Sequence, residues 1–309
     1  MRLEKLAQDY IRYKQALGAR FKTDAMHLGV FFELLNGRQS DITLSFVNEY
    51  LWRGSRTVAY WYRKYAVLNG FNRFLSSQGF SQLIPLPKEK PQITRPFVPY
   101  VLNSYELARF FAALPSICEE RFLPANTARL FFLLLYGTGL RVGEALGLKN
   151  ETVNTEQALL TVRSTKFYKT RLVPVSPLLQ HELIAYDKWK AAQKQDMQIT
   201  AYFRDRRGLA LVDYQVRSLF EDLRDHCRLS NPESGKRPRI HDFRHTFAVH
   251  RLTSAYRRGE DVQKLLPQLA TYLGHGSLGS TQVYLTMTPE LLSVANQRFE
   301  GYAFPGGAR

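Results

Sequence analysis

Five prolines within residues 81–106 divide this chain into two parts with different sequence patterns. Proline has no amide hydrogen to donate, and it disfavours helix in the residue before it. We therefore expect residues 81–103 to form an extended, solvated interdomain linker. A helix should restart in NSYELARFFAAL, with Ser104 as its capping residue. A length of 309 residues also suits two domains.

The part before this linker, residues 1–80, is predicted to be helical throughout. Apolar residues recur at helical spacing over about 2–17, 23–36, 43–52 and 56–79, and no alternating β pattern competes with them. In the last of these segments, basic residues alternate with aromatic ones. Such a face suits DNA phosphates, although an amphipathic helix whose basic side chains extend into solvent explains it equally well. The candidate DNA contacts in this segment are Arg56, Arg63, Lys64 and Arg73.

The part after the linker has a mixed pattern. Helical periodicity covers about 104–149 and resumes from 177. Between these ranges, ALLTVR and RLVPV are joined by the polar segment STKFYKT, which predicts a β-hairpin. The expected fold class is therefore mainly α with a small β-hairpin or sheet (α+β).

The charge balance narrows the choice of partner. Lys and Arg number 43 against 27 Asp and Glu, a formal net charge of +16. This charge suits a polyanion such as nucleic acid or an acidic membrane surface. The longest apolar run, LFFLLLY (130–136), is far shorter than the roughly 20 residues of a membrane-spanning helix. The first residues lack signal-peptide features, and two cysteines are too few for a disulfide framework. The charge therefore favours a nucleic-acid partner, and the low cysteine content favours a reducing compartment.

The segment HDFRHTFAVH (241–250) raises a question about Arg244, which lies beside an apolar stripe of Phe243 and Phe247. A guanidinium buried there is costly unless an anion meets it. His241 and His245 lie four residues apart, a spacing that can also bind a metal ion. The glutamate that a zinc protease motif requires after the first histidine is missing from this segment, and no cysteine lies nearby. The sequence therefore predicts an anion partner for Arg244 and no metal site.

Four stretches occur in a definite order along the second part: GTGLRVGEALGL (137–148), TVRSTKFYKTRLVPV (161–175), HDFRHTFA (241–248) and LGHGSLGSTQVYL (273–285). Together they resemble the tyrosine recombinase (phage integrase) family, over about residues 104–290. The resemblance implies a helical core-binding domain (1–80) and a catalytic domain (104–288) that form a C-shaped clamp on DNA. It also implies a tail helix over 289–309, packed on a neighbouring protomer or on its own core. The family pattern assigns the catalytic residues to Arg141, Lys166, His241, Arg244, His275 and Tyr284.

The resemblance gives each of these residues a chemical role. Tyr284 would attack the DNA phosphate and form a 3′-phosphotyrosyl ester. Arg141 and Arg244 would hold the non-bridging oxygens, because a planar guanidinium matches phosphate geometry. His241 would assist proton removal from the tyrosine, and His275 would donate a hydrogen bond to the phosphate. Because these groups stabilise the charge of the phosphate, we expect no metal ion, no ATP and no other cofactor.

Two lysines of the hairpin turn could protonate the leaving 5′-oxygen. Lys166 fits the spacing to RLVPV, and Lys169 is the second candidate. Their basic neighbours Arg163 and Arg171, with Lys169 itself, are candidate DNA contacts. Elsewhere, Glu144 and His245 are expected to support the active site, although Arg141 could simply pair with Glu144 one helical turn on.

The resemblance also predicts the partners and a cytoplasmic location, with association to the nucleoid when the protein acts. Double-stranded DNA with inverted-repeat core sites would be the substrate, and four protomers would assemble on two DNA sites, starting from protein that is mainly monomeric off DNA. One alternative is a type IB topoisomerase-like enzyme that nicks and reseals without exchange. A DNA-binding module that has lost activity and a metal-dependent nuclease are further alternatives.

Overall fold

The computed structural model describes residues 3–19, 21–38, 41–55, 57–92, 99–119, 121, 123–163, 170–193, 199–231 and 235–274. These residues form two compact units, one on each side of residues 93–98. Both units are mostly helical, and the second also holds a small antiparallel sheet, so the predicted fold class is confirmed. Within the described ranges, the structure has no helix with the length and apolar character needed to cross a membrane.

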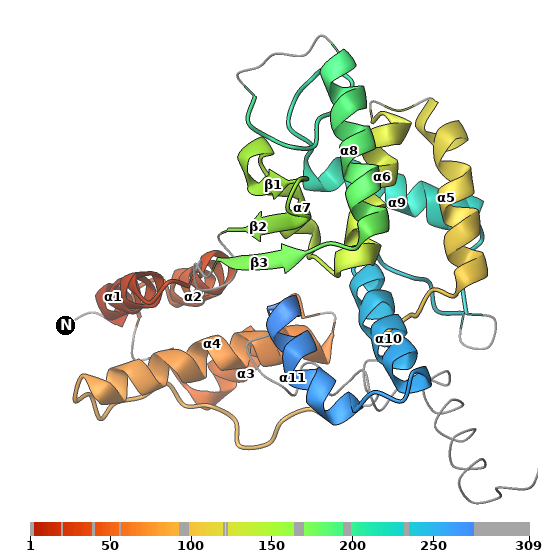
Figure 1. The fold of residues 1–309 in the computed structure, drawn as a ribbon. Coiled ribbons are helices and arrows are strands. Elements are labelled where there is room, and N and C mark those ends of the chain that lie inside the picture. The colour runs from red at the N-terminus through yellow and green to blue at the C-terminus, as the bar shows by residue number, and fades with distance from the viewer. Residues whose placement is uncertain are drawn as a thin grey trace, which may run out of the picture. The chain divides into compact units, whose positions relative to one another are not determined.

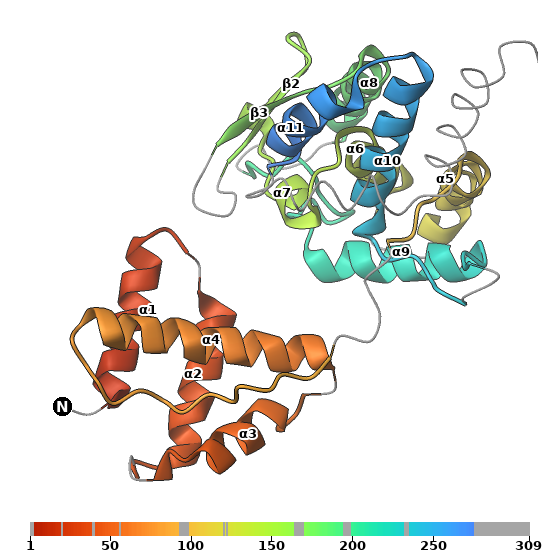
Figure 2. The same cartoon turned by 90° about the horizontal axis from the view of Figure 1, so that it is seen from below.

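The first unit is a helical bundle of α1 (Leu3–Ala16), α2 (Lys22–Leu35), α3 (Leu44–Trp52) and α4 (Val58–Ser77). Helix α4 contacts each of the other three, and Figure 2 shows it lying across them. Threonine side chains begin two of these helices, because Thr43 and Thr57 each accept a hydrogen bond from a backbone amide of the first turn. All four helices agree with the predicted ranges to within two residues.

The first half of the expected linker is extended, but it is not solvated throughout. Ile84 is 2% exposed, and the Asn72 side chain both donates to its carbonyl (2.8 Å) and accepts from its amide (2.9 Å). The Tyr62 hydroxyl also donates to the carbonyl of Pro91. The prediction of a solvated segment was therefore wrong for Ile84, whereas Leu83 and residues 88–90 are exposed as predicted. Ile84 and the partly buried Leu86 pack in the core of the first unit, a burial that local proline content does not reveal.

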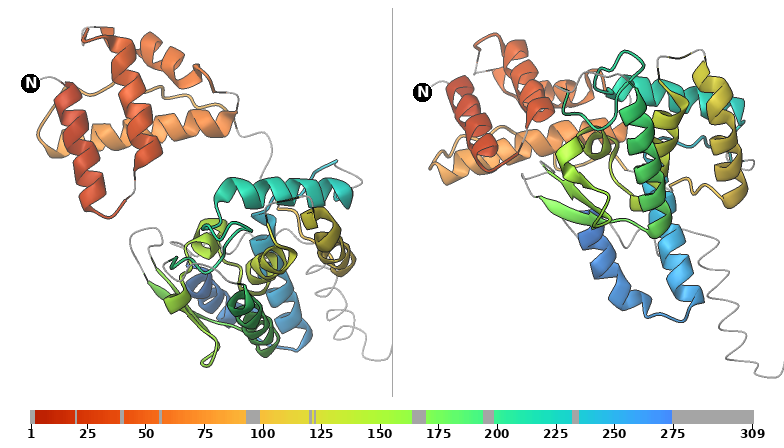
Figure 3. Two further views of the ribbon diagram at one scale, coloured as in Figure 1. Left: turned by 90° about the horizontal axis from the view of Figure 1, so that it is seen from above. Right: turned by 45° about the horizontal axis from the view of Figure 1, so that its top comes forward.

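The second unit is built around α6 (Ala125–Thr138), which contacts α5 (Ser104–Glu119), α8 (Pro177–Ala192) and α10 (Asp242–Arg257). Figure 1 shows these helices on several sides of α6. Its large apolar side chains explain this place, since Phe131, Phe132 and Leu134 are all fully buried. The other α-helices among the described residues of this unit are α7 (Val142–Leu146), α9 (Asp213–His226) and α11 (Val262–Leu273). Helix α11 packs against α10 through a separate apolar cluster, and Figure 3 shows the two connected by a short turn.

The start of α5 differs from the prediction. The Asn103 side chain accepts from the Glu106 amide, and the Glu106 carboxylate accepts from the Asn103 amide, both at 2.9 Å. This reciprocal pair makes Asn103 the capping residue, and Ser104 is already helical. Asparagine and serine cap equally well, so the glutamate three residues after Asn103 is the signal that decides between them.

The sheet has the order β1 (Val153–Asn154), β2 (Leu159–Val162), β3 (Arg171–Pro174), with both pairings antiparallel. Strands β2 and β3 form the predicted hairpin, in which Leu160 faces Val173. Strand β1 was not predicted, because two residues are too short to show an alternating pattern. The hairpin turn at 164–169 lies outside the described residues.

Candidate active site

Arg141 lies at the start of α7, directly after the turn that ends α6. Its backbone amide donates to Glu144 Oε2 (3.0 Å) and its Nη1 donates to Glu144 Oε1 (2.8 Å). The side chain remains 37% exposed. The turn depends on Gly139, which has a φ of +64°, and a Cβ there would lie 2.6 Å from Phe247. Glycine is therefore required at this position by both the backbone conformation and the close packing.

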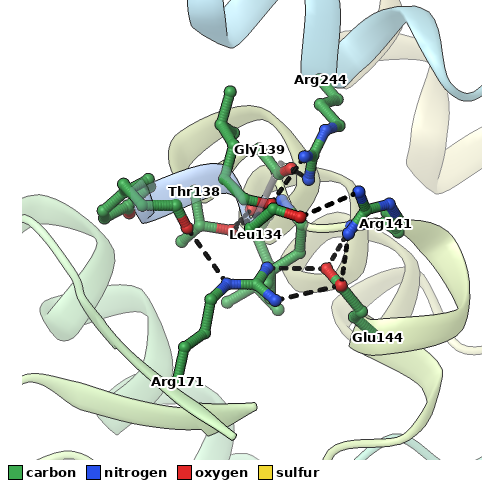
Figure 4. Close-up of polar contacts among 11 residues, drawn as sticks. Leu134, Thr138, Gly139, Arg141, Glu144, Arg171 and Arg244 are labelled. Atoms are coloured by element: carbon green, nitrogen blue, oxygen red, sulfur yellow. Dashed lines mark hydrogen bonds and ion pairs between the residues drawn. The ribbon is translucent and has the colours of Figure 1, made fainter. Parts of the chain in front are cut away.

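Glu144 binds a second arginine from the hairpin. Arg171 Nη1 and Nη2 donate to its two carboxylate oxygens at 3.0 and 2.8 Å, as Figure 4 shows. Burial alone would raise the pKa of Glu144, but the hydrogen bonds and charges of Arg171 and Arg141 outweigh it and lower this pKa to about 2. Glu144 therefore stays ionised at neutral pH, and it holds Arg141 by both backbone and side chain.

Arg171 is thus mostly enclosed by protein. Its side chain is 14% exposed, and its remaining donor nitrogen, Nε, bonds the carbonyl of Tyr272 at 3.0 Å. This geometry does not favour the DNA contact expected from the sequence. No local sequence signal separates Arg171 from the other basic residues of the hairpin, because its partners come from α7 and α11.

Arg244 is buried in the first turn of α10, with 1% of its surface exposed. Its Nη1 donates to the Gly139 carbonyl (2.7 Å), and its Nη2 donates to the Leu273 carbonyl (2.6 Å). Figure 4 shows its guanidinium directed towards the Gly139 turn, near Arg141. In this structure, two backbone carbonyl oxygens, which carry partial negative charge, therefore bind the guanidinium for which the sequence predicted an anion partner.

The C-terminal end of α11 gathers all three arginines. Three consecutive carbonyls accept from them: Tyr272 from Arg171 at 3.0 Å, Leu273 from Arg244 at 2.6 Å, and Gly274 from Arg141 at 3.3 Å. The last carbonyls of a helix have no partner within the helix and carry partial negative charge. Arginines from three distant parts of the chain therefore converge immediately before residue 275.

His241 and His245 lie beside this cluster, with ring centroids 5.1 Å apart. Although His241 is exposed at the start of α10, the loss of solvation around its ring and the charge of Arg244 lower its pKa to about 4. Loss of solvation and the neighbouring His241 likewise lower the pKa of His245 to about 4. Both rings are therefore neutral at pH 7, and a neutral imidazole can accept a proton. Among the described residues, no group of three or more His, Cys, Asp or Glu could hold a metal ion.

One expected DNA contact of the first unit is contradicted by the structure. Lys64 is 4% exposed, and its Nζ donates to the carbonyls of Tyr50 (2.9 Å) and Arg53 at the end of α3. Its ammonium therefore satisfies helix-terminal acceptors rather than phosphates. Arg63 is about half exposed and pairs with Asp24, and Arg73 is exposed.

Other expected site residues differ in whether the structure describes them. In the second unit, Arg163 pairs with Glu151 at the surface. The remaining expected residues lie outside the described residues: Arg56, Lys166, Lys169, His275, Tyr284 and the tail 289–309.

Comparison with known proteins places this geometry in a family. The model of the phage integrase family matches residues 103–290. A Sinorhizobium fredii protein named as an integrase/recombinase, y4rB, is 30% identical over 95% of each chain. Tyrosine recombinase XerC of Anoxybacillus flavithermus is 30% identical over 91% of this chain and 90% of its own.

A solved structure shows the same fold. A lambda integrase tetramer bound to a Holliday junction superposes with a TM-score of 0.63 at 16% identity, covering 94% of this chain and 78% of that one. The fold, the ordered motifs and the full-length relatives agree with one another. This chain belongs to the phage integrase family and is a tyrosine recombinase.

Proposed function

We propose that this protein is a site-specific recombinase that cuts and rejoins double-stranded DNA through a 3′-phosphotyrosyl ester and a Holliday junction, without metal or ATP. The observation that carries the proposal is the convergence of Arg141, Arg244 and neutral His241 beside the end of α11. A phosphodiester has one negative charge spread over two non-bridging oxygens, which two guanidiniums can bind. The family pattern adds a nucleophile ten residues beyond Gly274, at Tyr284.

Each step of the reaction can be assigned to one of these side chains, and no further reactant is needed. The Tyr284 oxygen attacks phosphorus and passes its proton to His241, while the bond to the 5′-oxygen breaks. Lys166 gives a proton to that oxygen, and His275 donates a hydrogen bond to the phosphate. Religation is the reverse attack by a 5′-hydroxyl, of the same or another strand. The ester conserves the free energy of the broken bond, so ATP has no role.

DNA changes the electrostatics of this site in a favourable direction. A phosphate placed between Arg141 and Arg244 adds a negative charge close to His241. Loss of solvation and the charge of Arg244 lower the pKa of His241 in the free protein, and the phosphate charge offsets the second of these causes. To that extent the imidazole becomes a better proton acceptor when substrate is bound. Arg141 is the more accessible of the two arginines, because 37% of its side chain is exposed.

We propose that the first unit completes a C-shaped clamp on inverted-repeat core sites, and that four protomers assemble on two sites from largely monomeric protein. The assembly is supported by the similarity to the lambda integrase tetramer on a Holliday junction. Arg63 and Arg73, exposed on α4, are the described residues of the first unit that we propose to contact DNA phosphates.

A covalent trapping experiment tests the reaction. The full chain is incubated in EDTA with a pool of nicked duplexes that carry randomised inverted half-sites, and adducts are separated on a denaturing gel and sequenced. We expect a protein–DNA adduct that is absent from Tyr284→Phe. An adduct that forms without exchange between two duplexes would favour the topoisomerase-like alternative. Duplex binding without any adduct would favour an inactive DNA-binding module, and cleavage abolished by EDTA would favour a nuclease.

A further inference from the structure

We propose that Arg171 is a positioning residue that keeps Arg141 available for the scissile phosphate. The proposal rests on the proposed function, and it replaces the expectation that Arg171 itself contacts DNA. Arg171 is the first residue of β3, whereas Arg141 caps α7, and both bind the carboxylate of Glu144.

The guanidiniums of Arg171 and Arg141 share one carboxylate, that of Glu144. Glu144 is 8% exposed and ionised, so its negative charge requires a close cation. Arg171 supplies it with two parallel hydrogen bonds, at 3.0 and 2.8 Å, whereas Arg141 uses a single side-chain nitrogen, at 2.8 Å. The two-pronged pair is the stronger geometry. Glu144 is thereby neutralised mainly by Arg171, and the charge of Arg141 is left for a substrate.

Without Arg171, the same carboxylate would have Arg141 as its nearest cation. A one-to-one pair with Glu144 would neutralise Arg141 and draw its guanidinium away from the phosphate. Removal of Arg171 would therefore reduce the positive charge that Arg141 presents to the non-bridging oxygens.

Arg171 also contacts the C-terminal end of α11. Its Nε holds the Tyr272 carbonyl, two residues before the Gly274 carbonyl that Arg141 binds. The packing is close, because a Cβ at Gly274 would lie 3.0 Å from Arg171 Nη1 and 3.2 Å from its Cζ. One side chain thus sets the position of both Glu144 and the chain that leads into residue 275.

The test compares cleavage of two suicide duplexes that differ only at the scissile position. One has the natural phosphate, and the other a methylphosphonate, in which a methyl group replaces a charged non-bridging oxygen. Single-turnover adduct formation is measured with full-length wild type, Arg171→Ala, Arg171→Lys and Arg129→Ala. The last variant is a matched control, since Arg129 pairs with Glu182 on the partly exposed surface of α6 and α8.

A neutral phosphonate needs less cationic stabilisation, so a defect in presented charge should shrink on it. We expect Arg171→Ala to form adduct about 100-fold more slowly than wild type on phosphate, and with a much smaller defect on methylphosphonate. Arg171→Lys keeps the charge but cannot form the two-pronged pair, so its rate of adduct formation on phosphate should lie between those of wild type and Arg171→Ala. Arg129→Ala should match wild type on both substrates.

Equal losses of Arg171→Ala on the two substrates would assign this residue a merely structural role and overturn the proposal. Should Arg171→Ala fail to fold, as shown by thermal unfolding, the same comparison made with Arg171→Lys decides the matter. Wild-type rates for these variants on phosphate would refute this inference alone. Absence of adduct from wild type on both duplexes would overturn the proposed function and this inference with it.

Discussion

Removing the charge of Glu144 should destabilise the second unit by an amount that depends on pH. Its carboxylate is 8% exposed and accepts four hydrogen bonds, two from Arg141 and two from Arg171, at 2.8 to 3.0 Å. Folding lowers its pKa from 4.5 to about 2. A difference of this size corresponds to about 3 kcal/mol of stability near neutral pH, as an order of magnitude.

The sign follows from the direction of the shift. A lowered folded-state pKa stabilises the protein above the unfolded pKa of 4.5, and this stabilisation is lost as the pH falls towards about 2. Glu144→Gln, which keeps the shape but carries no charge, should therefore be about 3 kcal/mol less stable than wild type at pH 7. The gap should begin to close only below about pH 4.5.

Urea titrations of the full chain at several pH values measure this difference, with hydrogen exchange of α6 amides reporting on the second unit alone. Glu151→Gln serves as the control, because Glu151 pairs with Arg163 at the surface, where both side chains are more than half exposed. Its effect should stay within about 0.5 kcal/mol. A Glu144→Gln loss no larger than that of the control, or a gap independent of pH down to pH 3, would refute the reasoning.

Three further predictions concern the active site and the DNA contacts. Because the pKa of His241 is lowered to about 4, log kcat/KM for adduct formation should show no titration of this base between pH 5 and 8. A decrease in kcat/KM caused by protonation of His241 with a midpoint near pH 6 or above would contradict the assignment. Gly274→Ala and Gly208→Ala should each lose about 1 kcal/mol in thermal unfolding, since φ is +67° at Gly274 and +78° at Gly208. Only Gly274→Ala, whose Cβ meets Arg171, should also slow adduct formation. In the first unit, Arg73→Ala should weaken duplex binding and reduce the salt slope of log K by about 1 without lowering the melting temperature. Lys64→Ala should instead lower the melting temperature, because the α3 carbonyls lose their donor, and the reverse pattern for these two variants would restore Lys64 as a phosphate contact.

Local sequence determined most of the helices, the hairpin and the identity of the candidate site residues. Helical periodicity located α1 to α4 to within two residues, and alternation located the β2–β3 hairpin. Glycine is the residue directly after α6 and after α11, where the φ values of +64° at Gly139 and +67° at Gly274 exclude most side chains. The ordered motifs identified the family, because the chemistry needs particular residue types in a particular order. These features depend on residues close together in the chain, so the sequence alone carries them.

The partners of the charged side chains depended on the tertiary structure. Basic residues of similar local context proved different: Arg73 is exposed, whereas Lys64, on the same helix, lies inside and binds the end of α3. Arg171 looked like a surface contact of the hairpin, yet its guanidinium is held by Glu144 from α7 and Tyr272 from α11. A buried charge must find acceptors wherever the fold supplies them. Those acceptors come from segments about 27 and 101 residues away in the chain, so only the packed structure could decide them.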